Sequence, residues 1–286
     1  MTGVARGVWL RDMQTADVEA GLRLCRRAGW NQRSEDWHAL LANGFFRVAE
    51  RDGSVVGCGG AVLYGRRLAW LAMILVDPVA RGQGIASRIV ADLLERVRGF
   101  DVVGLDATPQ GVPVYARSGF TDRSGLARMQ RAAGVTADSG GPSREIVPMT
   151  AADLDVVAVC DRRVFGADRA ALLRWAFAQA PEYAWRLAGP GATTGYLFGR
   201  HGHVSEHLGP LVAEAADAAA KLLVAAAAAR PQAAFTIDVP DRPGWIQALS
   251  RAGFALERPF RRMILGDAPT LGEPDRVFAS LGPEFA

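Results

Sequence analysis

The residues best suited to chemistry form a short glycine-rich turn, Arg81-Gly82-Gln83-Gly84-Ile85-Ala86, between an apolar segment and an amphipathic one. Such a turn is expected to start a helix, where backbone N–H groups lack acceptors and the helix dipole is positive. Glycine and alanine let a phosphate approach those N–H groups, and Arg81 adds a permanent cation. The turn is therefore predicted to hold a diphosphate, although taken alone it also fits an ordinary strand–helix turn.

Two elements must position this turn. Residues 68–76 are almost all apolar, which predicts a strand buried on both faces, and Asp77-Pro78 ends it. Residues 84–98 predict a helix that packs one face on a sheet, because the apolar side chains recur at helical spacing, at Ile85, Ile89, Leu93 and Val97. Gly99 is then a stop signal for that helix.

The rest of the first half predicts a mixed α/β fold, with antiparallel strands first and a strand–helix–strand unit after them. An Asp52-Gly53 hairpin turn joins two of the strands. The expected elements are helices over 17–28 and 112–117 and strands over 45–50, 54–63, 102–107 and from Phe120.

Matching landmarks in the two halves predict a duplicated fold. Ser118-Gly119-Phe120 is followed by Met129 ten residues after the glycine, and Ala252-Gly253-Phe254 is followed by Met263 at the same distance. The chain of 286 residues is long enough for two domains. The small and polar residues of 132–144 predict a linker, so the expected domains are 1–131 and 145–286.

Three pieces of the first half, in order, resemble the GNAT family of N-acetyltransferases. Arg81-x-x-Gly84-x-Ala86 is similar to that family's acyl-CoA signature, and residues 74–78 resemble the strand that leads into it. Tyr115 and the Gly119-Phe120 close resemble its later tyrosine-bearing helix. The resemblance implies a bacterial subgroup with two tandem GNAT-like domains, each a mixed, largely antiparallel sheet flanked by helices.

The resemblance also implies acetyl-CoA as co-substrate. Its pantetheine arm would lie between two diverging parallel strands and pair with the backbone of the first. The residues expected to contact the cofactor are Ile74, Leu75, Val76, Arg81, Gly82, Gln83, Gly84, Ile85, Ala86 and Ser87.

By the same resemblance, Tyr115 donates the proton that the departing thiolate needs; the alternative is an aromatic side chain packed on the sheet. Asp106 ends a strand beside the predicted cleft, so it either accepts a proton from the amine, binds an ammonium group, or holds the following turn. The two predicted catalytic residues are thus Tyr115 and Asp106.

An acceptor pocket is expected after the first helix, where aromatic and acidic side chains suit an amine. The candidates are Trp30, Asn31, Asp36 and Trp37. The alternative is a surface helix that Ser34 caps, with Asp36 and Trp37 in its first turn.

The second half is expected to be degenerate and without cofactor. Ala213-Glu214 stands where the glycine-rich turn would be, and Leu249 matches Tyr115. It is expected to cover the acceptor site or to mediate a homodimer. His201, His203 and His207 share strand parity, which makes a metal site conceivable, but none is predicted.

Composition narrows the possible partners and the cellular compartment. The net charge is +3 and the basic residues are scattered, so nucleic acid is not expected as a partner. Three cysteines without a CxxC pair, and no apolar leader or membrane span, favour a reducing cytoplasm. We expect an N-acetyltransferase that acts on the primary amine of a small molecule or peptide; the alternative is a non-catalytic acyl-CoA sensor or scaffold.

Overall fold

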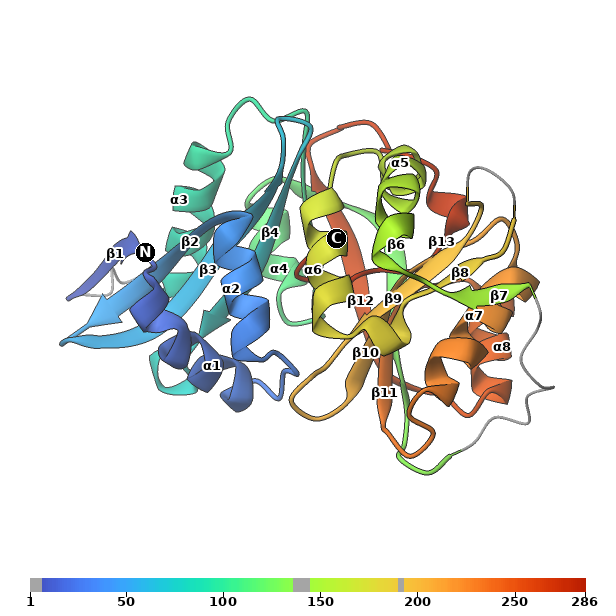
Figure 1. Ribbon diagram of the computed structural model, residues 1–286. Coiled ribbons are helices and arrows are strands. Elements are labelled where there is room, and N and C mark those ends of the chain that lie inside the picture. Colours follow the sequence, from blue (N-terminus) through green and yellow to red (C-terminus); the bar gives the residue numbers. More distant parts are fainter. Residues whose placement is uncertain (1–6, 136–144, 190–192) are drawn as a thin grey trace. The chain divides into compact units, whose positions relative to one another are not determined.

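The computed structural model describes residues 7–135, 145–189 and 193–286. Contacts between residues divide the chain into two compact units (Figure 1). Unit 1 holds residues 1–123 and 262–268 with Phe285, and unit 2 holds residues 124–261 and 269–284 with Ala286. These units do not follow the predicted ranges 1–131 and 145–286, because a segment near the end of the chain belongs to unit 1. Most of the predicted linker, 136–144, lies outside the described residues.

Unit 1 is a mixed sheet in the order β1-β2-β3-β4-β5, followed by the end of β12 and the start of β6. Neighbours from β1 to β4 are antiparallel, and β4 and β5 are parallel. The strands are β1 Val8–Asp12, β2 Gly44–Arg51, β3 Ser54–Tyr64, β4 Leu68–Val76, β5 Val102–Ala107, β6 Phe120–Arg131 and β12 Ala255–Leu265.

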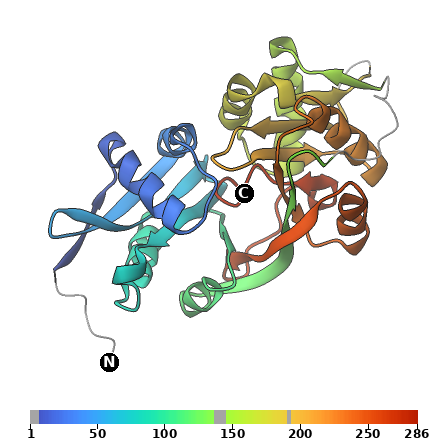
Figure 2. The same ribbon diagram turned by 90° about the horizontal axis from the view of Figure 1, so that it is seen from below.

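Helices cover both faces of this sheet. Figure 2 shows α1 and α2 on one face and α3 on the other. The helices are α1 Val18–Arg27, α2 Ser34–Ala42, α3 Ile85–Arg96 and α4 Val112–Arg117. The apolar stripe predicted for α3 is buried, since Ile85, Ile89 and Leu93 are each at most 2% exposed. The bounds of β4, β5 and α4 are those expected from the sequence.

Unit 2 repeats this plan, which confirms the predicted mixed α/β class with two tandem GNAT-like sheets. Its strand order is β7-β8-β9-β10-β11 and then the end of β6, with β10 and β11 parallel and the other neighbours antiparallel. The strands are β7 Ile146–Pro148, β8 Trp185–Leu187, β9 Tyr196–Arg200, β10 Glu206–Val212, β11 Phe235–Pro240 and β13 Val277–Ala279. The helices are α5 Leu154–Phe165, α6 Ala170–Gln179, α7 Ala216–Ala228 and α8 Pro243–Arg251.

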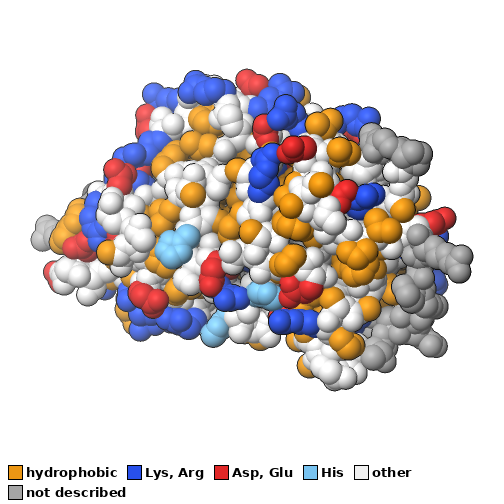
Figure 3. Space-filling view, viewed as in Figure 1, with side chains coloured by type: hydrophobic (Ala, Val, Ile, Leu, Met, Phe, Trp, Pro, Cys, Tyr) orange, Lys and Arg blue, Asp and Glu red, His pale blue; other side chains and the backbone are white. Residues whose placement is uncertain are grey.

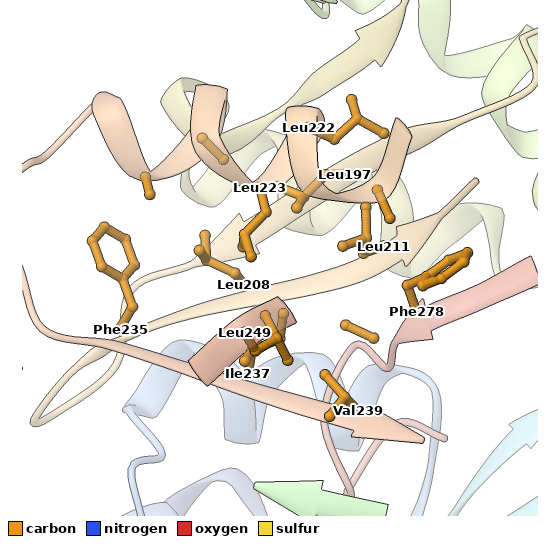
Figure 4. Packing of buried hydrophobic residues seen from close by; sticks show 14 of the residues in the cluster. Leu197, Leu208, Leu211, Leu222, Leu223, Phe235, Ile237, Val239, Leu249 and Phe278 are labelled. Carbon is orange, nitrogen blue, oxygen red and sulfur yellow. The ribbon is translucent and has the colours of Figure 1, made fainter. Parts of the chain in front are cut away.

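The core of unit 2 lies under α7 and α8. Figure 4 shows Leu223 of α7 facing Leu208 of β10, and Leu249 of α8 beside Ile237 of β11. Leu249 is 1% exposed, so the position that matches Tyr115 has become an ordinary core residue. Removal of this apolar surface from water is the main stabilising term for such a layer.

Two strands pass from one unit to the other. β6 begins in unit 1 and its residues from Ser124 on belong to unit 2, where they pair with β11. β12 begins in unit 2, and its residues from Arg262 on belong to unit 1. Each repeat is therefore completed by a strand from the other half of the sequence.

Candidate active site

The site begins where β4 and β5 separate. Their parallel ladder pairs Leu68 with Val102, Ala69 with Val103 and Trp70 with Gly104, and ends there. β4 continues to Val76 and β5 to Ala107, so the two strands diverge over those residues. The structure thus contains the divergence between parallel strands that the resemblance to the GNAT family implied at this point.

A β-bulge lies in β4 beside the gap. Gly60 pairs with Ala72 but Cys58 pairs with Leu75, so Met73 and Ile74 stand opposite Gly59 alone. Met73 has φ of 56°, a left-handed conformation that costs a non-glycine residue about 1–3 kcal/mol. Strained bulges of this kind occur near functional sites, where they redirect backbone groups.

The bulge determines which backbone groups face the gap. The N–H of Asp77 donates to Val56 O at 2.9 Å, so the backbone of Asp77 points toward β3. Because alternate residues of a strand point to opposite edges, Leu75 also points toward β3, while Ile74 and Val76 turn toward the gap. Of the three predicted contacts in β4, Ile74 and Val76 therefore have their backbone polar groups on the side of the gap, and Leu75 does not.

The glycine-rich turn follows β4 after Asp77 and a short 3-10 helix, Pro78–Ala80, and leads into α3. Gly82 and Gly84 have φ of 76° and 75°, and nothing lies within 4 Å of a Cβ placed on either. The left-handed conformation, and not lack of space, is therefore what favours glycine at these two positions. In the described part of the chain, no acceptor is found for the N–H groups of residues 82–87, a range that includes Gln83, Ile85, Ala86 and Ser87.

Three arginines lie around these N–H groups. Arg81 donates from Nε to Val76 O at 3.2 Å, and Arg51 donates to Gln83 Oε1 at 3.2 Å. Arg88 donates to Val8 O at 3.0 Å. Free N–H groups, the positive end of the α3 dipole and nearby cations together favour binding of a dianion such as a diphosphate.

Tyr115 packs beside the gap on α4. Its ring is half-buried against the core that includes Ile85 of α3 and Ala107 of β5, and it meets Phe120 edge-on at 6.1 Å. A Cβ on Gly111 would lie 2.8 Å from the Tyr115 ring, so glycine allows this approach. Burial raises the pKa of the Tyr115 phenol, which therefore stays protonated at neutral pH, as a proton donor must.

Asp106 is held by an arginine that sequence reasoning missed. Arg262 of β12 donates from Nε to Oδ1 at 2.9 Å and from Nη2 to Oδ2 at 2.8 Å. The Asp106 side chain is 0% exposed in this pair, and the guanidinium also lies 4.8 Å from the centre of the Trp70 ring. A carboxylate this enclosed is poorly placed to meet an amine.

The predicted acceptor residues fall into two groups. Trp37 is 0% exposed in the core, edge-on to Phe46 at 5.9 Å, and Asp36 is 2% exposed and accepts from Arg33 N at 2.7 Å. Asp36 and Trp37 thus lie at the start of a helix, as in the alternative to an acceptor pocket. The cap residue of that helix is Arg33 rather than Ser34. Trp30 and Asn31 are half-buried in the turn between α1 and α2.

Unit 2 has the same divergence, but the chain itself fills it. β10 pairs with β11 at Glu206–Phe235 and His207–Thr236 only. β13 pairs with β10 beyond that point, through Leu211–Ala279 and Val212–Val277, and Ser280 N donates to Asp238 O at 2.9 Å. A strand of the protein thus occupies the place that a pantetheine arm would need.

The three histidines do not form a cluster. His207 lies against Asp238 at 3.0 Å, and His201 lies 2.7 Å from Glu206. His203 is exposed outside the strands. Over the described residues, no group of three or more His, Cys, Asp or Glu side chains has a geometry that could hold a metal ion.

The distribution of charge on one face and the character of the helices bear on which partners the protein could bind. On the face drawn in Figure 3, Lys and Arg side chains are interspersed with Asp and Glu. Among the helices described, none has the length and apolar character needed to cross a membrane.

Two relatives that cover most of this chain have names that describe transferases. A Bacillus subtilis protein named uncharacterized N-acetyltransferase YitH is 27% identical over 225 residues, 78% of this chain and 79% of its own length. Holothin acyltransferase from a Pseudoalteromonas species is 29% identical over 220 residues, 76% of this chain and 73% of that protein. A solved structure from Pyrococcus horikoshii has a TM-score of 0.81 at 20% identity, over 98% of this chain and 96% of that one, which shows a common fold.

The fold, the site and these relatives define an acyltransferase, which answers the alternative of a sensor or scaffold in favour of an enzyme. The Acetyltransferase (GNAT) family matches residues 12–120, and an Acetyltransferase (GNAT) domain matches residues 157–279. The chain belongs to the GNAT family and carries a second GNAT-like domain in its C-terminal half.

Proposed function

We propose that this protein transfers an acetyl group from acetyl-CoA to the primary amine of a small molecule or peptide, by direct attack in a ternary complex. The observation that carries the proposal is the divergence of β4 and β5 directly beside the free N–H groups that start α3. That arrangement has room for an extended arm at one end and anion binding at the other.

Each part of the site has a role in this reaction. The N–H groups of residues 82–87 and Arg81 bind the diphosphate, and the backbone of Ile74 and Val76 pairs with pantetheine. An N–H beside the Met73 bulge polarises the thioester carbonyl and stabilises the oxyanion that develops. Tyr115 protonates the departing thiolate.

The amine must lose a proton before or during attack, since free amines have pKa values near ~10. The enclosure of Asp106 by Arg262 favours a water chain over direct contact as the proton acceptor. Trp30 and Asn31 are the predicted acceptor contacts that remain partly exposed, whereas Asp36 and Trp37 hold the start of α2. The name of one relative, an acyltransferase, is the reason to test longer acyl groups as well.

The test is thiol release by the full-length protein, measured with acetyl-CoA and a panel of amino acids, polyamines, aminoglycosides and peptide N-termini. We expect release above the hydrolysis rate with at least one class, and mass spectrometry should show the acetylated amine. Acetyl-CoA that fails to bind in calorimetry would refute the proposal.

A further inference from the structure

Arg262 contacts both strands at the point where the cofactor gap opens. Its guanidinium binds both oxygens of Asp106 on β5, at 2.9 and 2.8 Å, and lies over the ring of Trp70 on β4 at 4.8 Å. Trp70 and Gly104 form the last pair of the ladder, and Asp106 stands two residues beyond. One side chain therefore joins the two strands just where they begin to separate.

Gly104 makes this junction possible. A Cβ at Gly104 would lie 2.5 Å from the Trp70 ring and 2.8 Å from Cδ1 of Ile264. The missing side chain lets the indole lie across β5, where the guanidinium can stack on it. A two-pronged ion pair with a stacked cation restricts all three groups to one arrangement.

Unit 2 contains an equivalent arginine–aspartate pair, in which the arginine comes from β6. Arg128 of β6 binds both oxygens of Asp238 on β11, at 2.8 and 2.9 Å, and His207 of β10 lies 3.0 Å from the same carboxylate. His207 and Thr236 form the last pair of that ladder, with Asp238 two residues beyond. Arg128 and Arg262 each stand nine residues after the glycine of a Gly-Phe pair.

The two arginine–aspartate pairs differ in what occupies the space between the diverging strands next to them. In unit 2, β13 fills the gap, and Arg128 and Asp238 have side-chain exposures of 7% and 1%. In unit 1, the Arg262 side chain is 29% exposed, and β4 and β5 stay apart past the junction. The Arg128–Asp238 pair therefore only stabilises the fold of unit 2. The Arg262–Asp106 pair of unit 1 also lies beside strands that stay apart.

We propose that Arg262, carried by the C-terminal half of the sequence, is a positioning residue that sets the separation of β4 and β5 and so the fit of the pantetheine arm. The inference rests on the proposed use of acetyl-CoA. It makes the N-terminal half incomplete as an acyltransferase unless it has the strand that carries Arg262.

The test compares two ligands on the full-length protein. Acetyl-CoA uses both the glycine-rich turn and the gap, whereas 3′-phospho-ADP, its nucleotide part, has no pantetheine arm. We expect Arg262→Met to raise the Kd of acetyl-CoA by about 10- to 100-fold, the usual cost of a small displacement in a site, with the Kd of 3′-phospho-ADP unchanged. Arg262→Lys keeps the cation over Trp70 but not the fork, so it should fold and show an intermediate loss.

Arg128→Met and Arg128→Lys are the matched controls, because they break the equivalent pair in unit 2. They should lower the melting temperature while leaving both Kd values near wild type. Equal weakening of both ligands by the Arg262 variants, or the same loss in the Arg128 variants, would overturn the inference. Wild-type protein that binds neither ligand would instead remove the proposed function itself.

Discussion

The thiol of Cys58 donates a hydrogen bond to the carbonyl oxygen of Met73, across 3.3 Å of buried space between β3 and β4. Met73 is the residue with the left-handed conformation in the bulge beside the gap. The thiol therefore stabilises the part of β4 where ladder pairing is interrupted. Burial raises the pKa of Cys58, so the thiol stays neutral and able to donate.

Replacement of this thiol is expected to loosen the bulge. Cys58→Ala should lower turnover by about tenfold, since a displaced N–H no longer meets the thioester carbonyl. Cys58→Ser keeps a donor and should retain most activity. Steady-state rates and melting temperatures of the two variants check this, with Cys160→Ala as a control for a buried thiol on α5 of unit 2. Equal rates in the Ala and Ser variants would contradict the role.

Loss of the Tyr115 hydroxyl should slow chemistry and spare binding. Tyr115→Phe keeps the ring against Phe120, so acetyl-CoA affinity should be unchanged while kcat falls by about 10²- to 10⁴-fold, the usual range for a lost general acid. Calorimetry and pre-steady-state thiol release measure the two quantities. Because burial raises the phenol pKa, wild-type turnover should show no loss of this donor until pH exceeds its ordinary value of about 10.

Substitutions at Gly84 in the glycine-rich turn should be tolerated only when the new residue can adopt a left-handed backbone conformation. Gly84 has φ of 75° with open space around its Cβ position, so Asn, which tolerates this region, should fold normally at this position and bind acetyl-CoA. Gly84→Val should weaken acetyl-CoA binding by about tenfold or more, because a β-branched residue shifts the N–H groups out of the turn. Calorimetric Kd values for the two variants decide between conformation and bulk. Similar losses of acetyl-CoA affinity in the Asn and Val variants would show that side-chain size, not backbone conformation, limits this position.

One molecule of acetyl-CoA should bind per chain. Although the strands of unit 2 also diverge, β13 pairs with β10 where the pantetheine arm would lie, and Glu214 is in the turn before α7. A titration at known protein concentration should therefore give a stoichiometry near one. A value near two would show that β13 leaves the gap when the cofactor binds.

The buried pair in unit 2 should make stability depend on pH. Burial lowers the pKa of His207, an effect that Arg200 increases and Asp238 opposes. Below its ordinary value of about 6.5 the unfolded chain binds more protons than the folded one, so the free energy of unfolding falls as pH decreases through that window. His207→Gln keeps a donor for Asp238 and does not titrate there.

Urea unfolding between about pH 7.5 and 5 measures the difference. The wild-type free energy should fall more steeply than that of His207→Gln, whereas His203→Gln, at an exposed position, should follow the wild type. Parallel curves for all three proteins would exclude a contribution from His207. At lower pH, the low pKa of Asp238 continues the trend: burial raises it, but Arg128 and His207 lower it more, so stability is lost again as this carboxylate is protonated.

Local pattern was sufficient to predict the elements that form the site. The apolar run of β4 and the short helix α4 depend on neighbours in sequence, and their bounds match the structure. The helical spacing also predicted α3, which runs over Ile85–Arg96 within the expected range 84–98. The roles of individual site residues stay predictions. Trp37 shows why pattern alone was ambiguous: an aromatic in the first turn of a helix has the same spacing whether it faces a ligand or, as here, the core.

The partner of Asp106 could not be predicted from local pattern. The two Gly-Phe strands are alike, so either could complete either sheet, and pairing over 156 residues leaves no periodic signal nearby. The signal available was the repeat itself, since Arg128 and Arg262 fall at the same distance from their glycines. Register between repeats identifies equivalent residues, but tertiary packing determines which sheet each one enters.

The exchange of β6 and β12 also constrains how the molecule is made. Synthesis runs from the N-terminus, and domains ordinarily fold as they emerge from the ribosome. Here the first sheet receives residues 262–268 as its neighbour to β5, so it must wait for nearly the whole polypeptide before it is complete. Pairings that close such long loops form slowly, and the nascent first half presents an unfinished sheet edge to the cell until its late strand arrives.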